Sequence, residues 1–164
     1  MKTASRAAIV SPGDVVLHPA VIFAVVALAV NDHIAKSLWP GVITGKLSDV
    51  AGLVFFPILL VSLCEIGLAS LRRPAIPSRH VLVAAVAATA IAFFAVKVLS
   101  PAGDWYRVVW GFLSSPLRGS VTPVMLTQDF TDLLALPALV VAWRIGDRRI
   151  SLVARREAVE PPTF

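Results

Sequence analysis

Residues 81–99, VLVAAVAATAIAFFAVKVL, are apolar apart from Thr89 and Lys97. As a helix rising about 1.5 Å per residue, this stretch covers roughly 28 Å, close to the roughly 30 Å hydrocarbon core of a bilayer. Residues 15–35, 50–71 and 130–145 are apolar in the same way. We therefore predict an all-α, polytopic membrane protein built as a bundle of four transmembrane helices.

The composition of the chain agrees with this fold class. Of 164 residues, 57% are hydrophobic and 15% are charged, and the mean hydropathy is +0.82. Soluble domains carry about a quarter of charged residues, so a soluble chain of this length could not bury so much apolar surface. Residues 1–164 are expected to form a single membrane domain, with a basic tail at residues 146–164. The single cysteine, Cys64, excludes an intramolecular disulfide and a CxxC metal site.

The basic residues are distributed unequally between the two sides of the predicted bundle. Ten of the fifteen lie before the first span, between the second and third, or after the fourth: Lys2, Arg6, Arg72, Arg73, Arg79, Arg144, Arg148, Arg149, Arg155 and Arg156. Cytoplasmic loops of membrane proteins are enriched in Lys and Arg, so both termini are predicted to be cytoplasmic. Membrane lipids are the expected surroundings, and no basic recognition element points to nucleic acid.

A short aromatic segment lies between the third and fourth spans. Residues 104–113, DWYRVVWGFL, are too few to cross a bilayer. Trp105, Tyr106 and Trp110 are residue types typical of the membrane interface. We predict a short interfacial or re-entrant helix that ends at residues 114–116, and that acts either as a lid over a polar site or as a surface anchor.

Ionisable residues gather where all four predicted spans reach the outer side of the membrane. They are Asp32, His33, Lys36, Lys46, Asp49, Lys97, Asp104, Asp129 and Asp132. Ionisable groups at membrane depth are costly, and they are therefore functional candidates by default. The sequence thus predicts one outward-facing polar site.

Structural explanations compete with functional ones at the first two spans. Asp32 and Lys36 are four residues apart and can pair along one helix face. Ser48 or Asp49 suits the N-cap of a second span that begins near residue 50. Lys46 is not explained by capping, and a cation beside a helix N-terminus is suited to holding an anion.

The later spans raise the same alternatives. Asp129 and Asp132 match the spacing of a capping box at the start of the fourth span. Lys97 lies two residues before the end of the third span, where its ammonium can reach the outer interface or pair with a carboxylate. Glu65 lies in the inner half of the second span, and its expected partners are Arg72, Arg73 or His80.

The pattern NDH at residues 31–33, followed by TGKLSDVAGLVFFP at residues 44–57, resembles a sequence type of small, uncharacterised bacterial four-helix membrane proteins. The resemblance covers roughly residues 18–60. It implies a four-helix protein of the bacterial cytoplasmic (inner) membrane, and it implies no activity.

Three classes of function stay open. In the first, a membrane-embedded hydrolase or transferase acts on a lipid or lipid-linked substrate, with Asp32, His33, Lys46, Asp49 and Asp132 as catalytic residues. One divalent metal ion would take His33, Asp32, Asp49 and Asp132 as ligands. The second class is an accessory or structural subunit that joins a partner membrane protein or a homo-oligomer. The third is a small proton- or ion-coupled transporter.

Overall fold

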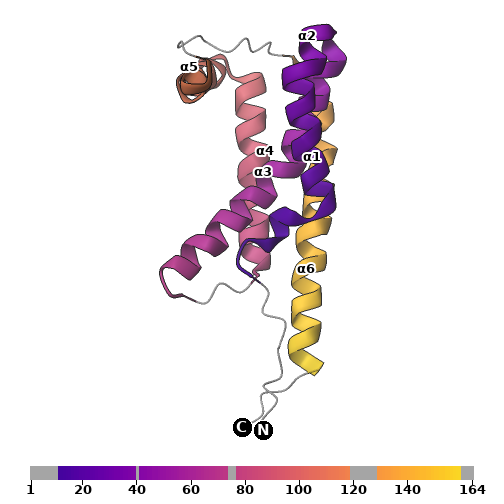
Figure 1. Ribbon diagram of the computed structural model, residues 1–164, viewed down its shortest axis with the longest axis vertical. Coiled ribbons are helices and arrows are strands. Elements are labelled where there is room, and N and C mark those ends of the chain that lie inside the picture. Colours follow the sequence, from indigo (N-terminus) through magenta and orange to yellow (C-terminus); the bar gives the residue numbers. More distant parts are fainter. Residues whose placement is uncertain (1–10, 40, 74–76, 119–128, 160–164) are drawn as a thin grey trace.

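The computed structural model describes residues 11–39, 41–73, 77–118 and 129–159, and these residues are helical without strands (Figure 1). The all-α prediction is therefore confirmed. Three helices, Pro19–Leu38, Val42–Ser70 and Arg79–Val98, are long and apolar enough to cross a membrane. They correspond to the first three predicted spans.

The first of these helices is interrupted near its upper end in Figure 1. A 3-10 turn, η1 (Asp14–Leu17), precedes α1 (Pro19–Val30), which continues through a π-helical turn, η2 (Asn31–Ala35), into α2 (Lys36–Leu38). Proline suits the first helical position because it needs no hydrogen-bond partner for its nitrogen there.

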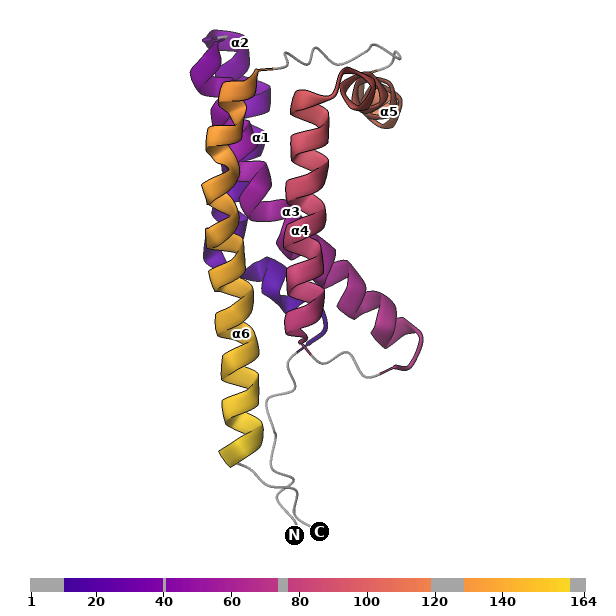
Figure 2. The same ribbon diagram turned by 180° about the vertical axis from the view of Figure 1, so that it is seen from behind.

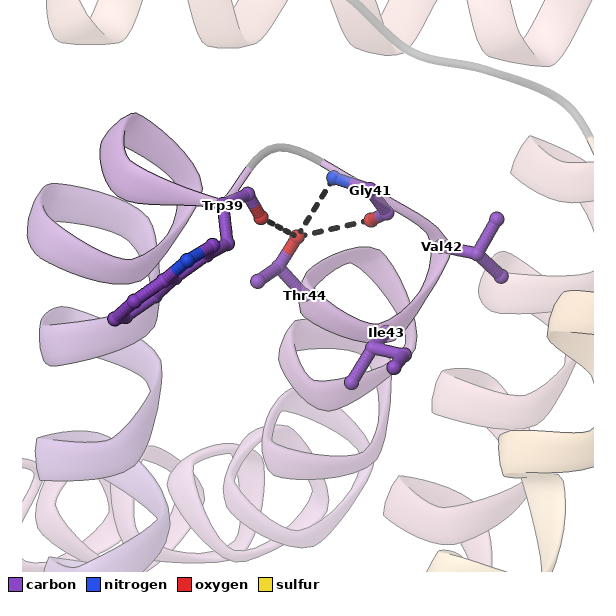
Figure 3. Close-up of a pocket in the computed structure, with 5 residues that line it drawn as sticks. All are labelled: Trp39, Gly41, Val42, Ile43 and Thr44. Carbon is purple, nitrogen blue, oxygen red and sulfur yellow. Dashed lines mark hydrogen bonds between the residues drawn. The ribbon is translucent and has the colours of Figure 1, made fainter.

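The second helix, α3 (Val42–Ser70), begins eight residues before the predicted residue 50. Its first turn is held by Thr44, whose hydroxyl accepts the Gly41 N–H at 3.2 Å and lies 2.9 Å from Gly41 O (Figure 3). Ser48 and Asp49 therefore lie inside the helix, and the prediction that one of them is its N-cap is wrong.

Proline bends α3 part-way along its length. Pro57 lies inside the helix and is buried. A proline removes one backbone hydrogen bond and its ring disturbs the preceding turn. The second half of α3 accordingly leaves the other helices at an angle (Figures 1 and 2).

The next two helices in the chain meet at a sharp corner. The bounds of α4 (Arg79–Val98) agree with the predicted residues 81–99 to within two residues. The next helix, α5 (Ser100–Arg118), is longer than the predicted residues 104–113 and does not end at residues 114–116. It lies across the end of α4 (Figures 1 and 2).

The last helix combines two geometries. A 3-10 helix, η3 (Phe130–Ala138), runs without a break into α6 (Leu139–Val159). The predicted fourth span ended at residue 145, whereas the helix continues through residues 146–159 of the predicted basic tail. Its apolar run between Asp132 and Arg144 is short, and the helix is not among the three that are apolar enough to span by themselves.

Four helices share one hydrophobic core. Val21, Ile58, Leu82 and Ala142 come from α1, α3, α4 and α6, and each is fully buried. Gly146 allows α6 to approach α4 closely, since a Cβ at this position would lie 2.5 Å from a methyl carbon of Leu82. The outer faces of the helices are apolar and exposed, as expected for helices surrounded by lipid.

Candidate functional site

Lys97 lies in the last turn of α4 and is the centre of a polar network. Its Nζ donates to Asp49 Oδ2 of α3 and to Asp132 Oδ2 of η3, at 2.8 Å each. These three side chains are only 10%, 16% and 11% exposed. The ring of Phe93, one turn earlier on α4, lies 5.6 Å from Nζ and adds a cation–π contact. Three helices are thus joined through one buried ammonium group.

Lys46 completes this network from the edge. Its Nζ lies 2.7 Å from Thr131 Oγ1 and 3.3 Å from Asp132 Oδ1. Asp132 therefore binds one lysine with each carboxylate oxygen. The Lys46 side chain is 31% exposed, whereas that of Lys97 is 10% exposed. We call Lys46, Asp49, Lys97 and Asp132 the Lys97 network.

Asp129 caps the helix that carries Asp132, as predicted. Its carboxylate accepts the Thr131 N–H at 2.8 Å and the Thr131 hydroxyl at 2.7 Å. These bonds favour the charged form and lower the pKa of Asp129. The other half of the predicted capping box is wrong, because both oxygens of Asp132 face lysines. Thr131 was not predicted as a site residue.

The early start of α3 explains why two of the predicted residues meet the network. Lys46 and Asp49 are three residues apart in a continuous helix, so they share one face. That face lies toward α4 and η3, where Lys97 and Asp132 sit at the same level. Lys46 was predicted to lie beside a helix N-terminus, where a cation can hold an anion. That position is wrong, because Lys46 lies in the second turn of α3 and binds side chains of η3.

The remaining predicted residues lie on the α1 side of the same end. Asp32 pairs with Lys36 at 2.7 Å, as predicted, and accepts the Ser48 hydroxyl at 2.7 Å. Asn31 is 1% exposed, and its Nδ2 lies 2.6 Å from both Thr44 O and Ser48 Oγ. We call Asn31, Asp32, Thr44 and Ser48 the Asn31 cluster.

His33 belongs to neither group. It is exposed, and no hydrogen bond or ion pair joins it to another part of the chain that the structure describes. The predicted metal ligands His33, Asp32, Asp49 and Asp132 are accordingly not assembled into one site. Within residues 11–39, 41–73, 77–118 and 129–159, no group of three or more His, Cys, Asp or Glu side chains is placed to hold a metal ion.

The helix α5 packs on α4, the helix that carries Lys97. Burial raises the pKa of Tyr106, which lies in this helix. The predicted aromatic segment therefore lies next to the helix that supplies the central residue of the Lys97 network. The turn between α2 and α3 adds only a shallow apolar pocket, lined by Trp39, Gly41, Val42, Ile43 and Thr44 (Figure 3).

A second ionic network lies at the other end of the molecule. Glu65, 3% exposed, forms a bidentate pair with Arg149 at 2.6 and 3.0 Å, so the predicted partners Arg72, Arg73 and His80 are wrong. The Gly13 N–H donates to Glu65 at 2.9 Å, and Asp14 lies 2.6 Å from Arg149. The positive φ of Gly13, 80°, is readily adopted only by glycine. This network fastens the N-terminal segment to α3 and α6.

Comparisons of the chain with protein-family models, with curated proteins and with solved structures gave no match. The resemblance of residues 18–60 to bacterial membrane proteins therefore stays a prediction. The function has to be inferred from the geometry of the polar groups.

Proposed function

We propose that the chain crosses the bacterial inner membrane four times, with residues 130–144 as the fourth span. As an α-helix these fifteen residues would cover only about 22 Å. Nine of them form the 3-10 helix η3, which rises about 2.0 Å per residue, so the segment extends to roughly 27 Å. That length approaches the roughly 30 Å hydrocarbon core. The shared core of α1, α3, α4 and α6 supports the same arrangement.

The proposed orientation places the Lys97 network outside and both termini in the cytoplasm. Arg72 follows the end of α3 and Arg79 begins α4, at the opposite end of that helix from Lys97, and Arg148 lies beyond the apolar part of α6. This distribution agrees with the positive-inside rule. The helix α5 then lies in the outer interface. Its exposed apolar stripe repeats at the spacing of one helix face: Trp105, Val108, Val109 and Phe112.

This arrangement is tested by cysteine labelling, because the chain has a single cysteine. In a Cys64→Ser background, Asp104→Cys and Arg155→Cys introduce exposed thiols on the two sides of the proposed fourth span. A membrane-impermeant maleimide should label position 104 in intact spheroplasts and position 155 only after permeabilisation. Labelling of both positions in intact spheroplasts would mean that residues 130–144 do not cross.

We propose that the protein is an accessory or structural membrane subunit, whose outer end is held in one shape for contact with a partner membrane protein or a second copy. The observation that carries this proposal is the position of Lys97 between Asp49 and Asp132, at 2.8 Å from each. Its positive charge is already neutralised by two carboxylates and is not free to bind a phosphate. The network therefore fits the joining of helices better than it fits catalysis.

The second candidate is hydrolysis or group transfer on a lipid or lipid-linked substrate. It is favoured by Lys46, which is partly exposed beside Asp129 and Thr131. Lys97 holds Asp132 through Oδ2, so Lys46 can turn toward a headgroup phosphate or a developing oxyanion and leave Asp132 Oδ1 to act as the base. Ion-coupled transport has less support, because Glu65, the acid of the inner half, is bound by Arg149.

Proteoliposomes made from bacterial lipid extract separate the two candidates. In the structural role, Asp132→Asn lowers the thermal stability of the protein, and mass spectrometry finds the same lipids in vesicles with wild-type protein, in vesicles with the variant and in empty vesicles. In the enzymatic role, wild-type protein generates a lipid product that Asp132→Asn does not. That second result would overturn the structural proposal.

A further inference from the structure

The π-helical turn Asn31–Ala35 places one amide side chain in an unusual position. Asn31 opens this turn and is 1% exposed, packed between α1 and the first turns of α3. Single π turns inside α-helices are rare, and those that are known lie frequently at functional sites. The residue is far enough from water that every polar atom of its side chain needs a partner within the protein or a bound ligand.

The amide of Asn31 is only half satisfied. Its Nδ2 lies 2.6 Å from Thr44 O and 2.6 Å from Ser48 Oγ. Its Oδ1 is buried and has no hydrogen-bond partner among the residues that the structure describes. An unpaired buried oxygen is costly, so this orientation leaves a hydrogen-bonding capacity unused.

Rotating the amide by 180° gives the alternative arrangement. Oδ1 then takes the place of Nδ2, close to Thr44 O and Ser48 Oγ. Asp32 Oδ1 lies a further 2.7 Å from Ser48 Oγ. Four oxygens from one amide, one backbone carbonyl, one hydroxyl and one carboxylate are thus brought together. The Ser48 hydroxyl still donates to Asp32, but the rotated Asn31 Oδ1 faces Thr44 O and Ser48 Oγ with no proton between them, and such oxygens repel one another unless a positive charge lies between them.

We propose that the Asn31 cluster binds a monovalent metal cation, Na⁺ in the first instance. The ligands are Asn31 Oδ1, Thr44 O, Ser48 Oγ and the Asp32 carboxylate. An all-oxygen donor set suits hard cations, and a single carboxylate balances a single positive charge, whereas Ca²⁺ sites use several carboxylates. In membrane transporters, backbone carbonyls and helix ends near irregular helical segments coordinate Na⁺.

Lys36 is the competitor of the ion. Its ammonium lies 2.7 Å from Asp32 Oδ1, and the side chain is 42% exposed. It can therefore release Asp32 and turn into water when a cation binds. Replacing Lys36 by a neutral residue should therefore strengthen cation binding. If Lys36 and Asp32 formed only a structural ion pair, the same replacement would lower the stability of the protein.

The test is thermal unfolding of the purified full chain in detergent, in NaCl or in choline chloride at equal ionic strength. At ten times the dissociation constant, Na⁺ should raise Tm by roughly 3–6 °C. The rise should saturate, should disappear in Asn31→Ala and Ser48→Ala, and should reach its half-maximum at lower Na⁺ in Lys36→Gln. Asp129→Ala, which alters a carboxylate outside the Asn31 cluster, is the matched control and should keep the full rise.

Two results would overturn the site. One is an equal Tm in NaCl and choline chloride for the wild-type protein. The other is a Na⁺-dependent rise that persists in Ser48→Ala, which leaves Asn31 in place and decides the question even where Asn31→Ala does not fold. A response to Ca²⁺ or Mg²⁺ without a response to Na⁺ would overturn the assignment to a monovalent ion. The proposal is independent of the Lys97 network, so Asp49→Asn should also keep the Na⁺ response.

Discussion

Replacing Lys97 by methionine should destabilise the protein more than any other single change in the Lys97 network. The substitution keeps the apolar length of the side chain and removes the ammonium that binds Asp49 and Asp132 at 2.8 Å each. The two carboxylates are 16% and 11% exposed, so they remain poorly solvated. Breaking a buried ion pair by removing one partner costs about 3–5 kcal/mol.

A matched variant on the same network calibrates this estimate. Lys46→Met removes a cation whose side chain is 31% exposed and whose contact with Asp132 is longer, 3.3 Å. Partly exposed ion pairs contribute only about 0.2–1 kcal/mol. At about 2–4 °C per kcal/mol for a chain of this size, the expected fall in Tm is roughly 6–20 °C for Lys97→Met and at most about 4 °C for Lys46→Met.

The assay is circular dichroism at one heating rate, with wild-type and variant proteins in the same detergent. A third variant, Lys97→Met with Asp49→Asn and Asp132→Asn, removes the unpaired charges together and should recover most of the lost stability. The reasoning is refuted if Lys97→Met melts no lower than Lys46→Met. It is equally refuted if the triple variant is as unstable as Lys97→Met alone.

Three further predictions concern other parts of the chain. Glu65→Gln should cost about 1–3 kcal/mol, because Arg149 loses its bidentate partner and keeps Asp14 and the longer contact with Ser11 O. Chemical unfolding measures this cost, and an unchanged midpoint would contradict the role of the pair. Gly146→Ala should cost about 1–3 kcal/mol by overpacking against Leu82, and a melting temperature equal to that of wild type would show that α6 can move aside. Asp129→Ala should lower Tm at neutral pH. Because the pKa of Asp129 is lowered in the folded protein, the difference in Tm should be present above the ordinary pKa of 3.8 and should vanish as the pH falls through the lowered pKa. A difference in Tm that persists in acid would argue against the stabilising role of the cap.

The long apolar segments could be predicted from the sequence because their length alone identifies them. The start of α3 could not, because Lys46 and Asp49 resemble a polar boundary in a hydropathy profile. Their partners, Asp132 and Lys97, are 86 and 48 residues away in the chain. Since a profile evaluates each charge without its partner, a paired charge inside a helix is mistaken for the end of that helix.

The sequence predicts the common depth of the polar residues along the helices, but it does not predict which of them contact one another. All of them were expected at one depth, and the structure does bring Lys46, Asp49, Lys97 and Asp132 together. His33 was expected to join them because it lies in the same polar run as Asp32. Residues two apart point to opposite sides of a helix, and here Asn31 is the buried one, whereas His33 is exposed. Hydropathy does not identify which of several neighbouring polar residues faces the other helices.

The composition of α4 explains why a membrane helix would retain a costly lysine. Two of its alanines, Ala85 and Ala90, lie on the packed face of the helix, where small side chains allow close packing but distinguish poorly between one register and the next. A slide of α4 by one turn, about 5.4 Å, would keep much of this contact. It would break both 2.8 Å bonds of Lys97 and separate Lys97 from Asp49, with Lys46 as the remaining partner of Asp132. The ionic network therefore defines the register of α3, α4 and η3, which supports a structural role more directly than a catalytic one.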